Sequence, residues 1–176
     1  KISPRFIWIC WPTTRATNSF LMNDRHIHDV VRILKKDLGA EKLPIVTALA
    51  EREADPFAIL ISTLLSLRTK DEVTADATDR LFRLASTPQE MLALPEKEMI
   101  EAIYPVGFYR NKARTIHEAC RVLIERFDSR VPDTIEELLT IKGVGRKTAN
   151  LVVGLGYGKP SICVDTHVHR ISNRLG

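Results

Sequence analysis

The chain has 176 residues, of which 44% are apolar and 27% charged, and it carries a net charge of +4. This length suffices for one hydrophobic core and a second small lobe, and the absence of a long apolar run excludes a transmembrane helix. Residues 1–104 carry 14 basic and 15 acidic side chains, whereas residues 105–176 carry 12 and 7. This asymmetry favours a polyanionic partner, with a mildly basic solvated surface as the alternative.

Helical spacing of apolar residues begins after Met22 and continues through most of the chain. We therefore expect Met22 to be the biological start and residues 1–21 to be a non-native or disordered leader. For the strongly apolar residues 57–67, β-branched content alone permits a strand, but the Asp-Pro start favours a helix. Helices are expected at residues 23–38, 57–67, 71–84, 87–94, 95–103 and 108–127. Without a β-hairpin pattern or an internal repeat, these elements predict an all-α fold with short connections.

The three cysteines, Cys10, Cys120 and Cys163, lie far apart and lack the spacing of metal ligands. We expect free thiols in a reducing compartment, with Cys120 in the core on an apolar stripe of helical period. His167 and His169 are two residues apart, so on a helix they point in different directions and make a poor metal pair.

A glycine hairpin follows in residues 138–150, which read LLTIKGVGRKTAN. Asp133 and Glu136 have the spacing of an N-cap and a third helical residue, and they open a short helix that Gly143 ends. Glycines at 143 and 145 can take positive φ and leave backbone N–H groups uncovered, so a phosphate oxygen can approach the N-terminus of the next helix. This is the geometry of a helix-hairpin-helix at about residues 134–157, although a glycine turn without a ligand is the structural alternative.

These residues carry a family resemblance. Residues 143–150 (GVGRKTAN) with 164–167 (VDTH) resemble endonuclease III, the bifunctional DNA glycosylase and abasic-site lyase of the helix-hairpin-helix-GPD superfamily. Further motifs follow the family's order and spacing, so that the match covers about residues 44–176: LLS at 64–66, TKD at 69–71, IYPVGFY at 103–109, KA at 112–113 and VP at 131–132. The resemblance implies a two-lobed helical DNA glycosylase fold.

By that resemblance, Lys147 matches the Schiff-base nucleophile and Asp165 the essential carboxylate. The chemistry suits both residue types, because an amine that attacks the sugar C1′ expels the base and forms an iminium that permits β-elimination. The amine must be neutral, and Arg146 together with the helix N-terminus acts in that direction. A carboxylate near the sugar stabilises oxocarbenium charge. The structural alternatives are a phosphate-contacting Lys147 and an Asp165 that caps the last helix.

Two further segments are expected at the DNA. Leu67 and Arg68 occupy a corner where the family carries a glutamine that fills the space of an extruded nucleotide, and Arg68 departs from that pattern. Residues 107–112 present a turn, aromatics and cations that can contact phosphate or line a base pocket, although Phe108 and Tyr109 suit a core equally well. The expected DNA-binding residues are Gly143, Val144, Gly145, Arg146, Thr148, Leu67, Arg68 and Lys112.

The resemblance also implies a domain organisation. We expect a six-helix barrel-type lobe at residues 49–159 and a partial second lobe from residues 22–48 with 160–176. The family's [4Fe–4S] cluster would take its four cysteines beyond Gly176, so no cofactor and no metal is expected within this chain. The expected protein is a monomer in a prokaryotic cytoplasm, associated with the nucleoid and not with a membrane.

The function that the resemblance implies is removal of oxidised pyrimidines from double-stranded DNA and cleavage at abasic sites. A monofunctional mispair glycosylase of the same superfamily is one alternative, although it would not need Lys147. A non-catalytic helix-hairpin-helix module is another, and it leaves Lys147 with Asp165 unexplained.

Overall fold

The computed structural model describes residues 24–37, 46–47 and 55–175, which divide between two compact units. One unit contains residues 40–167, and the other contains residues 1–39 and 168–176. The expected leader 1–21, the Met22 start, Cys10 and both predicted ends of the first helix lie outside the described residues. The lobe limits expected from the sequence, 49–159 and 22–48 with 160–176, stay a prediction.

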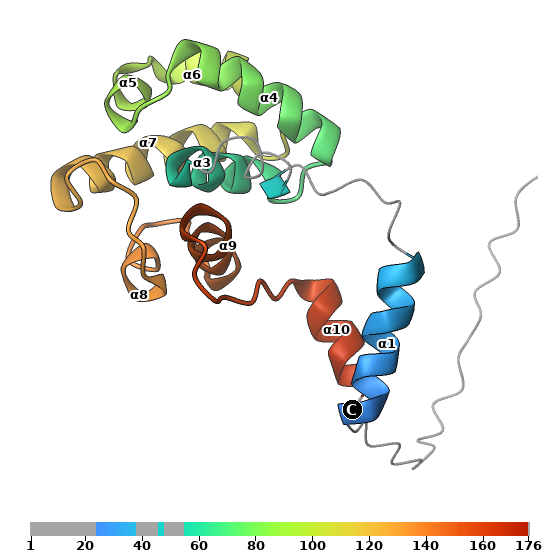
Figure 1. The fold of residues 1–176 in the computed structure, drawn as a ribbon. Helices are drawn as coiled ribbons and strands as arrows, with labels where there is room; N and C mark the ends of the chain where they lie inside the picture. The colour runs from blue at the N-terminus through green and yellow to red at the C-terminus, as the bar shows by residue number, and fades with distance from the viewer. Residues whose placement is uncertain (1–23, 38–45, 48–54, 176) are drawn as a thin grey trace, which may run out of the picture. The chain divides into compact units, whose positions relative to one another are not determined.

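The regular structure of the described residues is entirely helical, as predicted (Figure 1). The helices are α1 (Asp24–Asp37), α3 (Pro56–Ser66), α4 (Asp71–Leu84), α5 (Pro88–Ala93), α6 (Glu96–Ile103), α7 (Tyr109–Arg126), α8 (Ile135–Leu138), α9 (Arg146–Tyr157) and α10 (Thr166–Leu175). Of the helices described, none combines the length and apolar character needed to cross a membrane.

Helix α3 is the centre of the 40–167 unit. Its side chains from Phe57 to Leu65 are buried on every face, because α9, α4 and α7 all pack against it. In Figure 1, α3 lies between α9 and α4. Burial of one such Leu or Ile side chain contributes about 1.5–3 kcal/mol, so this helix anchors the elements that carry the candidate site.

Local capping explains where several helices begin. The Asp55 carboxylate accepts from the backbone N–H groups of Phe57 and Ala58, and Pro56 occupies the first helical position. A capping box of Thr87 and Glu90 is present at the start of α5. These signals are short-range and therefore readable in the sequence.

Helix α7 buries the predicted stripe that includes Cys120, confirming its place in the core. Burial raises the pKa of the Cys120 thiol to about 12, so this group is chemically inert near neutral pH. In the other unit, α1 keeps Ile27, Val31 and Leu34 at least 40% exposed. The apolar face predicted for that helix is present but is not buried by the described residues.

Candidate active site

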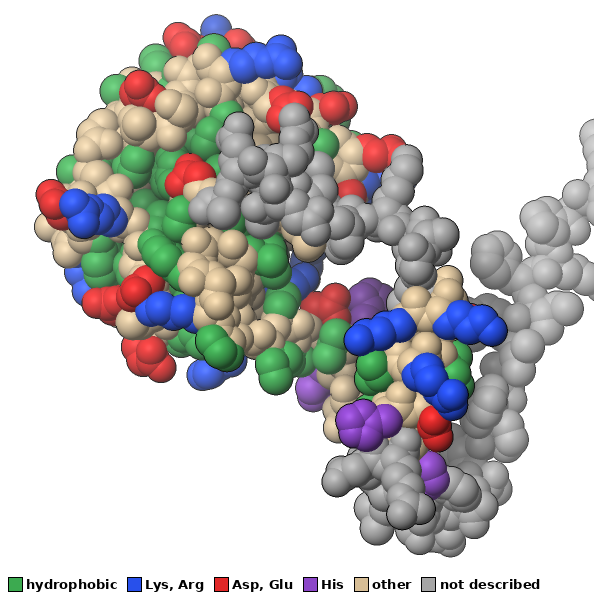
Figure 2. Space-filling view, viewed as in Figure 1, with side chains coloured by type: hydrophobic (Ala, Val, Ile, Leu, Met, Phe, Trp, Pro, Cys, Tyr) green, Lys and Arg blue, Asp and Glu red, His purple; other side chains and the backbone are tan. Residues whose placement is uncertain are grey.

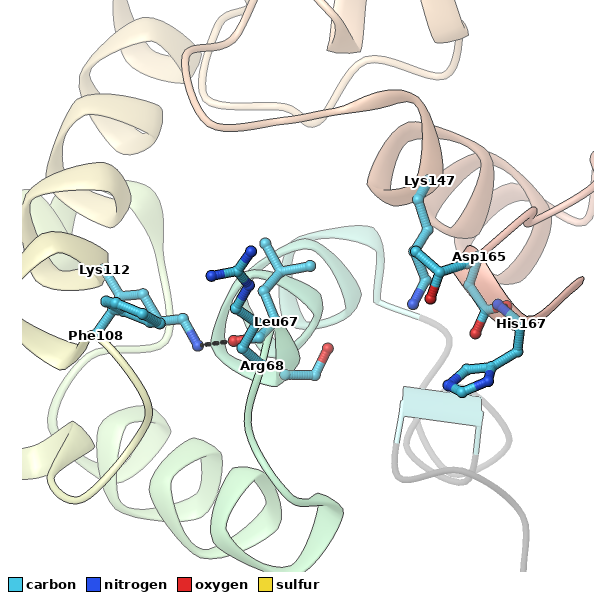
Figure 3. A pocket seen from close by; sticks show the side chains of 9 residues that line it. Leu67, Arg68, Phe108, Lys112, Lys147, Asp165 and His167 are labelled. Atoms are coloured by element: carbon cyan, nitrogen blue, oxygen red, sulfur yellow. Dashed lines mark hydrogen bonds between the residues drawn. The ribbon is translucent and has the colours of Figure 1, made fainter. Parts of the chain in front are cut away.

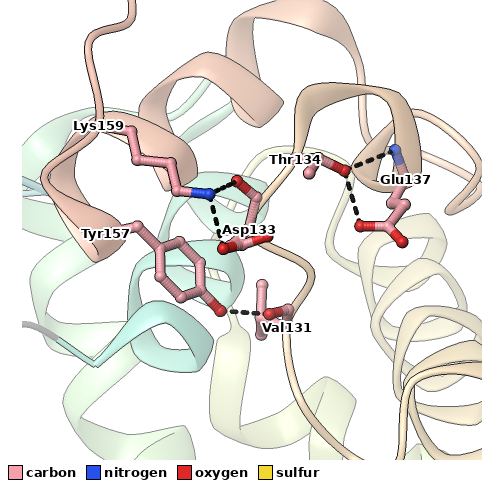
Figure 4. A network of polar contacts seen from close by, with 6 residues as sticks. All are labelled: Val131, Asp133, Thr134, Glu137, Tyr157 and Lys159. Carbon is pink, nitrogen blue, oxygen red and sulfur yellow. Dashed lines mark hydrogen bonds and ion pairs between the residues drawn. The ribbon is translucent and has the colours of Figure 1, made fainter.

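The hairpin begins one residue later than the sequence suggested. Thr134, not Asp133, is the N-cap of α8, and its side chain accepts from the backbone N–H of Glu137 at 3.4 Å. The Thr134 hydroxyl also donates to the Glu137 carboxylate at 2.7 Å (Figure 4). The predicted cap pair of Asp133 and Glu136 is therefore wrong, because the neighbouring Thr134–Glu137 pair has the same spacing and satisfies the backbone N–H of Glu137.

Asp133 instead fastens the two ends of the helix-hairpin-helix together. Its carboxylate and its carbonyl accept from the Lys159 ammonium at 2.6 and 3.0 Å. Nearby, the Tyr157 hydroxyl at the end of α9 donates to the carbonyl of Val131 (Figure 4). Burial and the charge of Asp133 raise the pKa of Tyr157, so this donor keeps its proton. These contacts fix α9 relative to the segment that enters α8.

The two hairpin glycines serve different needs. Gly143 has φ +90°, and a Cβ there would lie 2.3 Å from Cγ2 of Thr115 on α7. Gly145 has φ −93° and ψ 173°, so the positive φ expected there is wrong, because Gly145 takes the extended conformation of an N-cap. A Cβ at Gly145 would meet nothing within 4 Å. The fold requires glycine at 143, whereas at 145 the missing side chain leaves open space beside the first turn of α9.

This first turn of α9 is suited to an anion. Gly145 is its N-cap without a side-chain hydrogen bond, and no acidic residue occupies the turn. Arg146 and Lys147 are exposed, whereas the side chains of Val144 and Thr148 are buried, so these two residues can offer a ligand only backbone groups. The helix dipole and its uncovered N–H groups favour negative charge here. Contact of these residues with DNA stays a prediction.

Lys147 and Asp165 line one cavity in the 40–167 unit, with a volume of about 760 Å³ (Figure 3). The cavity is lined by Ser66, Leu67, Arg68, Phe108, Lys112, Lys147, Asp165, Thr166 and His167. Lys147 enters it from α9, and Asp165 lies just before α10. Residues that are eighteen positions apart in the chain thus reach the same space.

Asp165 combines two of the interpretations that the sequence left open. Its carboxylate accepts from the backbone N–H of His167 at 2.9 Å, as a helix cap does, and it also lines the cavity. Beneath the first turn of α9, the Cys163 thiol donates to the carbonyl of Lys147 at 3.9 Å. The pKa of the Cys163 thiol is raised, chiefly by burial. The charge of Lys147 lowers this pKa and the charge of Asp165 raises it, so both charged groups lie close enough to act on the thiol.

Across the cavity, an arginine and an aromatic ring face one another. Arg68 follows the C-terminus of α3, and its guanidinium lies 5.8 Å from the centre of the Phe108 ring. Both residues adopt left-handed backbone conformations, with φ 55° and 58°. Phe108 is 61% exposed and lines the cavity, whereas Tyr109 is half-buried against the core. The sequence allowed both residues to line a base pocket or to pack in the core, and the structure places Phe108 at the pocket and Tyr109 against the core.

Lys112 also lines the cavity, but it differs from the exposed cation that the sequence suggested. Its side chain is 8% exposed, and its ammonium donates to the carbonyls of Leu65 and Leu67 and to the Thr69 hydroxyl. Direct contact of Lys112 with phosphate stays a prediction, although its three N–H donors are already engaged within the protein.

The cavity therefore gathers Lys147, Asp165, Leu67, Arg68 and Lys112 from the predicted set, while the remaining hairpin residues lie outside its lining. It adds Ser66, Thr166 and His167, which the sequence did not single out as site residues. Ser66 and Thr166 adjoin predicted residues in the sequence and His167 lies two positions after Asp165, and this proximity was the available signal. On the face shown in Figure 2, basic and acidic side chains of the unit are interspersed.

The described residues do not fit an iron–sulfur cluster. They include no group of three or more His, Cys, Asp or Glu side chains that could hold a metal ion. Cys120 is buried in the core, and Cys163 lies under α9, so these two thiols are separate.

Comparison with known proteins places the chain among DNA repair proteins. Residues 61–176 match the family described as HhH-GPD superfamily base excision DNA repair protein. The chain is 53% identical over 125 residues to endonuclease III of Thermotoga maritima, a match that covers 71% of this chain and 59% of that protein. The chain thus spans about three fifths of the length of this relative.

Solved structures show the same fold. A structure described as a trapped endonuclease III–DNA covalent intermediate matches with a TM-score of 0.76 and 36% identity, covering 86% of this chain and 68% of that one. A thermostable thymine-DNA glycosylase matches with a TM-score of 0.73 and 26% identity, covering 83% of this chain and 66% of that one.

Proposed function

Because the chain belongs to the endonuclease III family of HhH-GPD base excision DNA repair proteins, we propose that it removes damaged bases from duplex DNA and cleaves the abasic sites that result. The observation that carries this proposal is the meeting of Lys147 and Asp165 in one cavity. A non-catalytic module that only binds DNA phosphates would need the hairpin but not Lys147 together with Asp165. The proposed substrates are oxidised pyrimidines.

In the proposed reaction, the Lys147 amine attacks C1′ of the damaged nucleotide, so that a C–N bond forms and the glycosidic bond breaks. The base departs and takes up a proton. Opening of the C1′–O4′ bond then gives an iminium between Lys147 and the sugar. Loss of a C2′ proton to a base breaks the C3′–O bond and releases the 3′ strand, and water finally frees the lysine.

Asp165 would act at the step in which positive charge develops on the sugar. Its carboxylate lines the same cavity and is oriented by the backbone N–H of His167. A fixed negative charge near the sugar stabilises an oxocarbenium ion as the base departs. The cap contact with α10 thus supports the proposed catalytic position.

The hairpin would hold the DNA backbone. The uncovered first turn of α9 and the open space at Gly145 suit a phosphate, which positions the duplex without reading its sequence. We further propose a monomer that acts at the prokaryotic nucleoid. In this proposal, the [4Fe–4S] cluster of the family is held by cysteines beyond Gly176.

Borohydride trapping on a duplex with an abasic site tests the proposed chemistry, because only an amine nucleophile forms an iminium that borohydride reduces to a stable crosslink. The full-length protein should trap and cleave. Lys147→Gln should abolish both reactions while leaving binding largely intact, because one cation among several phosphate contacts contributes little. Lys97→Gln provides the control, since this exposed lysine lies on α6 and is 4.0 Å from Glu101.

Asp165→Asn separates the two steps. It should slow base removal more than it slows cleavage of preformed abasic sites, because the charge that the carboxylate offsets develops as the base departs. Robust trapping by Lys147→Gln would assign the nucleophile to another residue. Base excision without any trapping by the wild type would indicate a monofunctional glycosylase, and DNA binding without either reaction would indicate a non-catalytic module.

A further inference from the structure

A buried ammonium group lies at the corner where α3 ends. Lys112, in the first turns of α7, places Nζ 2.6 Å from the carbonyl oxygen of Leu65 and 2.6 Å from that of Leu67. Its third contact is the hydroxyl oxygen of Thr69 at 3.0 Å. All three acceptors are neutral, and together they match the three protons of the ammonium.

Placing a charge here is costly for the fold. Burial lowers the pKa of Lys112 to about 8, which reflects an ammonium that has lost water without gaining a carboxylate. An apolar side chain of similar length would avoid this desolvation penalty. Core packing alone therefore does not explain a lysine at this position.

The three acceptors show what the lysine accomplishes. The last carbonyls of a helix have no partner within the helix and carry its negative dipole end, so a cation that donates hydrogen bonds to them terminates α3 favourably. Beyond α3 the chain turns sharply, with Leu67 at φ −57° and ψ 115° and Arg68 left-handed at φ 55°. A left-handed non-glycine residue costs on the order of 1–3 kcal/mol and persists only where its surroundings enforce it.

A second contact from the start of α7 encloses the same corner. The backbone N–H of Gly107 donates to the Thr69 hydroxyl at 3.1 Å, and a Cβ at Gly107 would lie only 2.6 Å from the carbonyl oxygen of Arg68. The corner of residues 67–69 is thus held between Gly107 and Lys112. Figure 3 shows the Lys112 ammonium bonded to this corner on the side opposite Lys147.

The side chains at this corner are part of the candidate site. Leu67 and Arg68 are exposed and line the cavity that holds Lys147 and Asp165. A small rotation of the backbone at Arg68 would move its guanidinium away from the Phe108 ring, which lies 5.8 Å from it. The position of these side chains therefore depends on the contacts that fix the corner.

We propose that Lys112 is a positioning residue whose ammonium holds the 67–69 corner, so that Leu67 and Arg68 face the nucleotide cavity in one arrangement. The expected effect on base excision rests on the proposed function, whereas the expected effect on the structure of the corner does not. It assigns Lys112 a role behind the cavity wall instead of a direct contact with phosphate.

The catalytic consequence is a selective loss of base excision. Lys112→Met keeps an unbranched side chain of similar length but removes all three donors. Excision of an oxidised pyrimidine from duplex DNA should fall on the order of 10- to 100-fold, because displaced groups at a site cost rates of this size. Trapping on a preformed abasic site should fall less than about threefold, since no stacked and paired base must be extruded.

Two variants control for general damage to the fold. Lys112→Arg keeps the charge and several donors, so it should restore part of the excision activity relative to Lys112→Met. Arg114→Met removes an exposed cation from the same helix, where it pairs with Glu96 at 3.1 Å, and should leave both reactions unchanged. Equal losses on the damaged and the abasic duplex in Lys112→Met would overturn the proposal, as would no loss on either.

A structural measurement keeps this test independent of catalysis. In the DNA-free protein, Lys112→Met should speed amide hydrogen exchange at residues 67–69 and trypsin cleavage after Arg68, while exchange in α4 stays unchanged. Unchanged exchange at the corner would overturn the proposal whatever the activity. A wild type that fails to trap would instead overturn the proposed function.

Salt dependence of DNA binding separates the positioning role from phosphate contact. If Lys112 neutralised a phosphate, Lys112→Met would lower the slope of log affinity against log salt by about one. We expect an unchanged slope, and a reduced one would overturn the proposal.

Discussion

Gly143 and Gly145 flank one residue of the hairpin, yet substitution by alanine should have different effects. Alanine at 143 should lower the stability of the fold, whereas alanine at 145 should lower the affinity for DNA. At Gly143, the backbone has φ +90°, and the new Cβ would lie 2.3 Å from Cγ2 of Thr115. The left-handed conformation costs about 1–2 kcal/mol for a residue with a Cβ, and overpacking adds about 1–3 kcal/mol. Gly143→Ala should therefore lower the free energy of unfolding by roughly 2–5 kcal/mol.

The steric part of this loss can be recovered. Thr115→Ser removes Cγ2, the atom that the new Cβ would strike, and keeps the hydroxyl that donates to the Asn111 carbonyl at 2.9 Å. In a double-mutant cycle, Thr115→Ser should offset about 1–3 kcal/mol of the Gly143→Ala loss. The left-handed backbone cost should remain.

Gly145→Ala should leave stability within about 1 kcal/mol of the wild type, because its backbone is extended and its Cβ would enter open space. Affinity for duplex DNA should fall on the order of 10-fold, the equivalent of about 1.5 kcal/mol for one hydrogen bond to a charged group. Damaged and undamaged duplexes should be affected alike, because a phosphate contact carries no base information.

Urea unfolding measures the stability of each variant, and salt-titrated binding on damaged and undamaged duplexes measures affinity. Wild-type affinity in Gly145→Ala would remove the hairpin backbone from the DNA interface. No coupling between Gly143→Ala and Thr115→Ser would show that the contact with α7 does not require glycine at 143.

Two further predictions concern stability. The pKa of Lys112 is about 8 in the folded protein and returns to about 10.4 on unfolding, so the unfolded chain binds more protons between these values. Urea unfolding of the wild type should therefore show stability rising by up to about 3 kcal/mol as the pH rises through this window. Lys112→Met should lack that rise, and equal pH profiles would contradict the prediction. Tyr157→Phe removes the donor to the Val131 carbonyl and should cost about 1–2 kcal/mol. Lys159→Gln, its neighbour in an exposed ion pair, should cost less than about 1 kcal/mol, and the reverse order in urea unfolding would show that the Tyr157 contact does not hold the hairpin.

The elements predicted well from the sequence are those whose signals are local. Residues 71–84 form α4 with the predicted bounds, and α3 begins at the Asp55 cap and Pro56. Caps and apolar periodicity act over one or two turns, so the chain alone reveals them. The helix cap at Thr134 was missed by one residue because Asp133 and Glu136 offer the same spacing as Thr134 and Glu137.

The sequence also predicted that Lys147 and Asp165 belong to one site, because they match a family motif and lie close along the chain, and both residues line the same cavity. Their residue types restrict the possible reactions, and the catalytic roles that the family motif implies for them stay a prediction. The structure adds that Asp165 both caps α10 and lines the cavity, which the sequence had left as alternatives.

The environment of Lys112 was decided by tertiary structure alone. In the sequence this residue is a cation at a helix start, but its acceptors at Leu65 and Leu67 lie 47 and 45 residues earlier in the chain. The same holds at Gly143, where Thr115 of α7 supplies the atom that excludes a side chain. Burial and hydrogen-bond partners depend on which helices pack together, and no local pattern of residues contains that information.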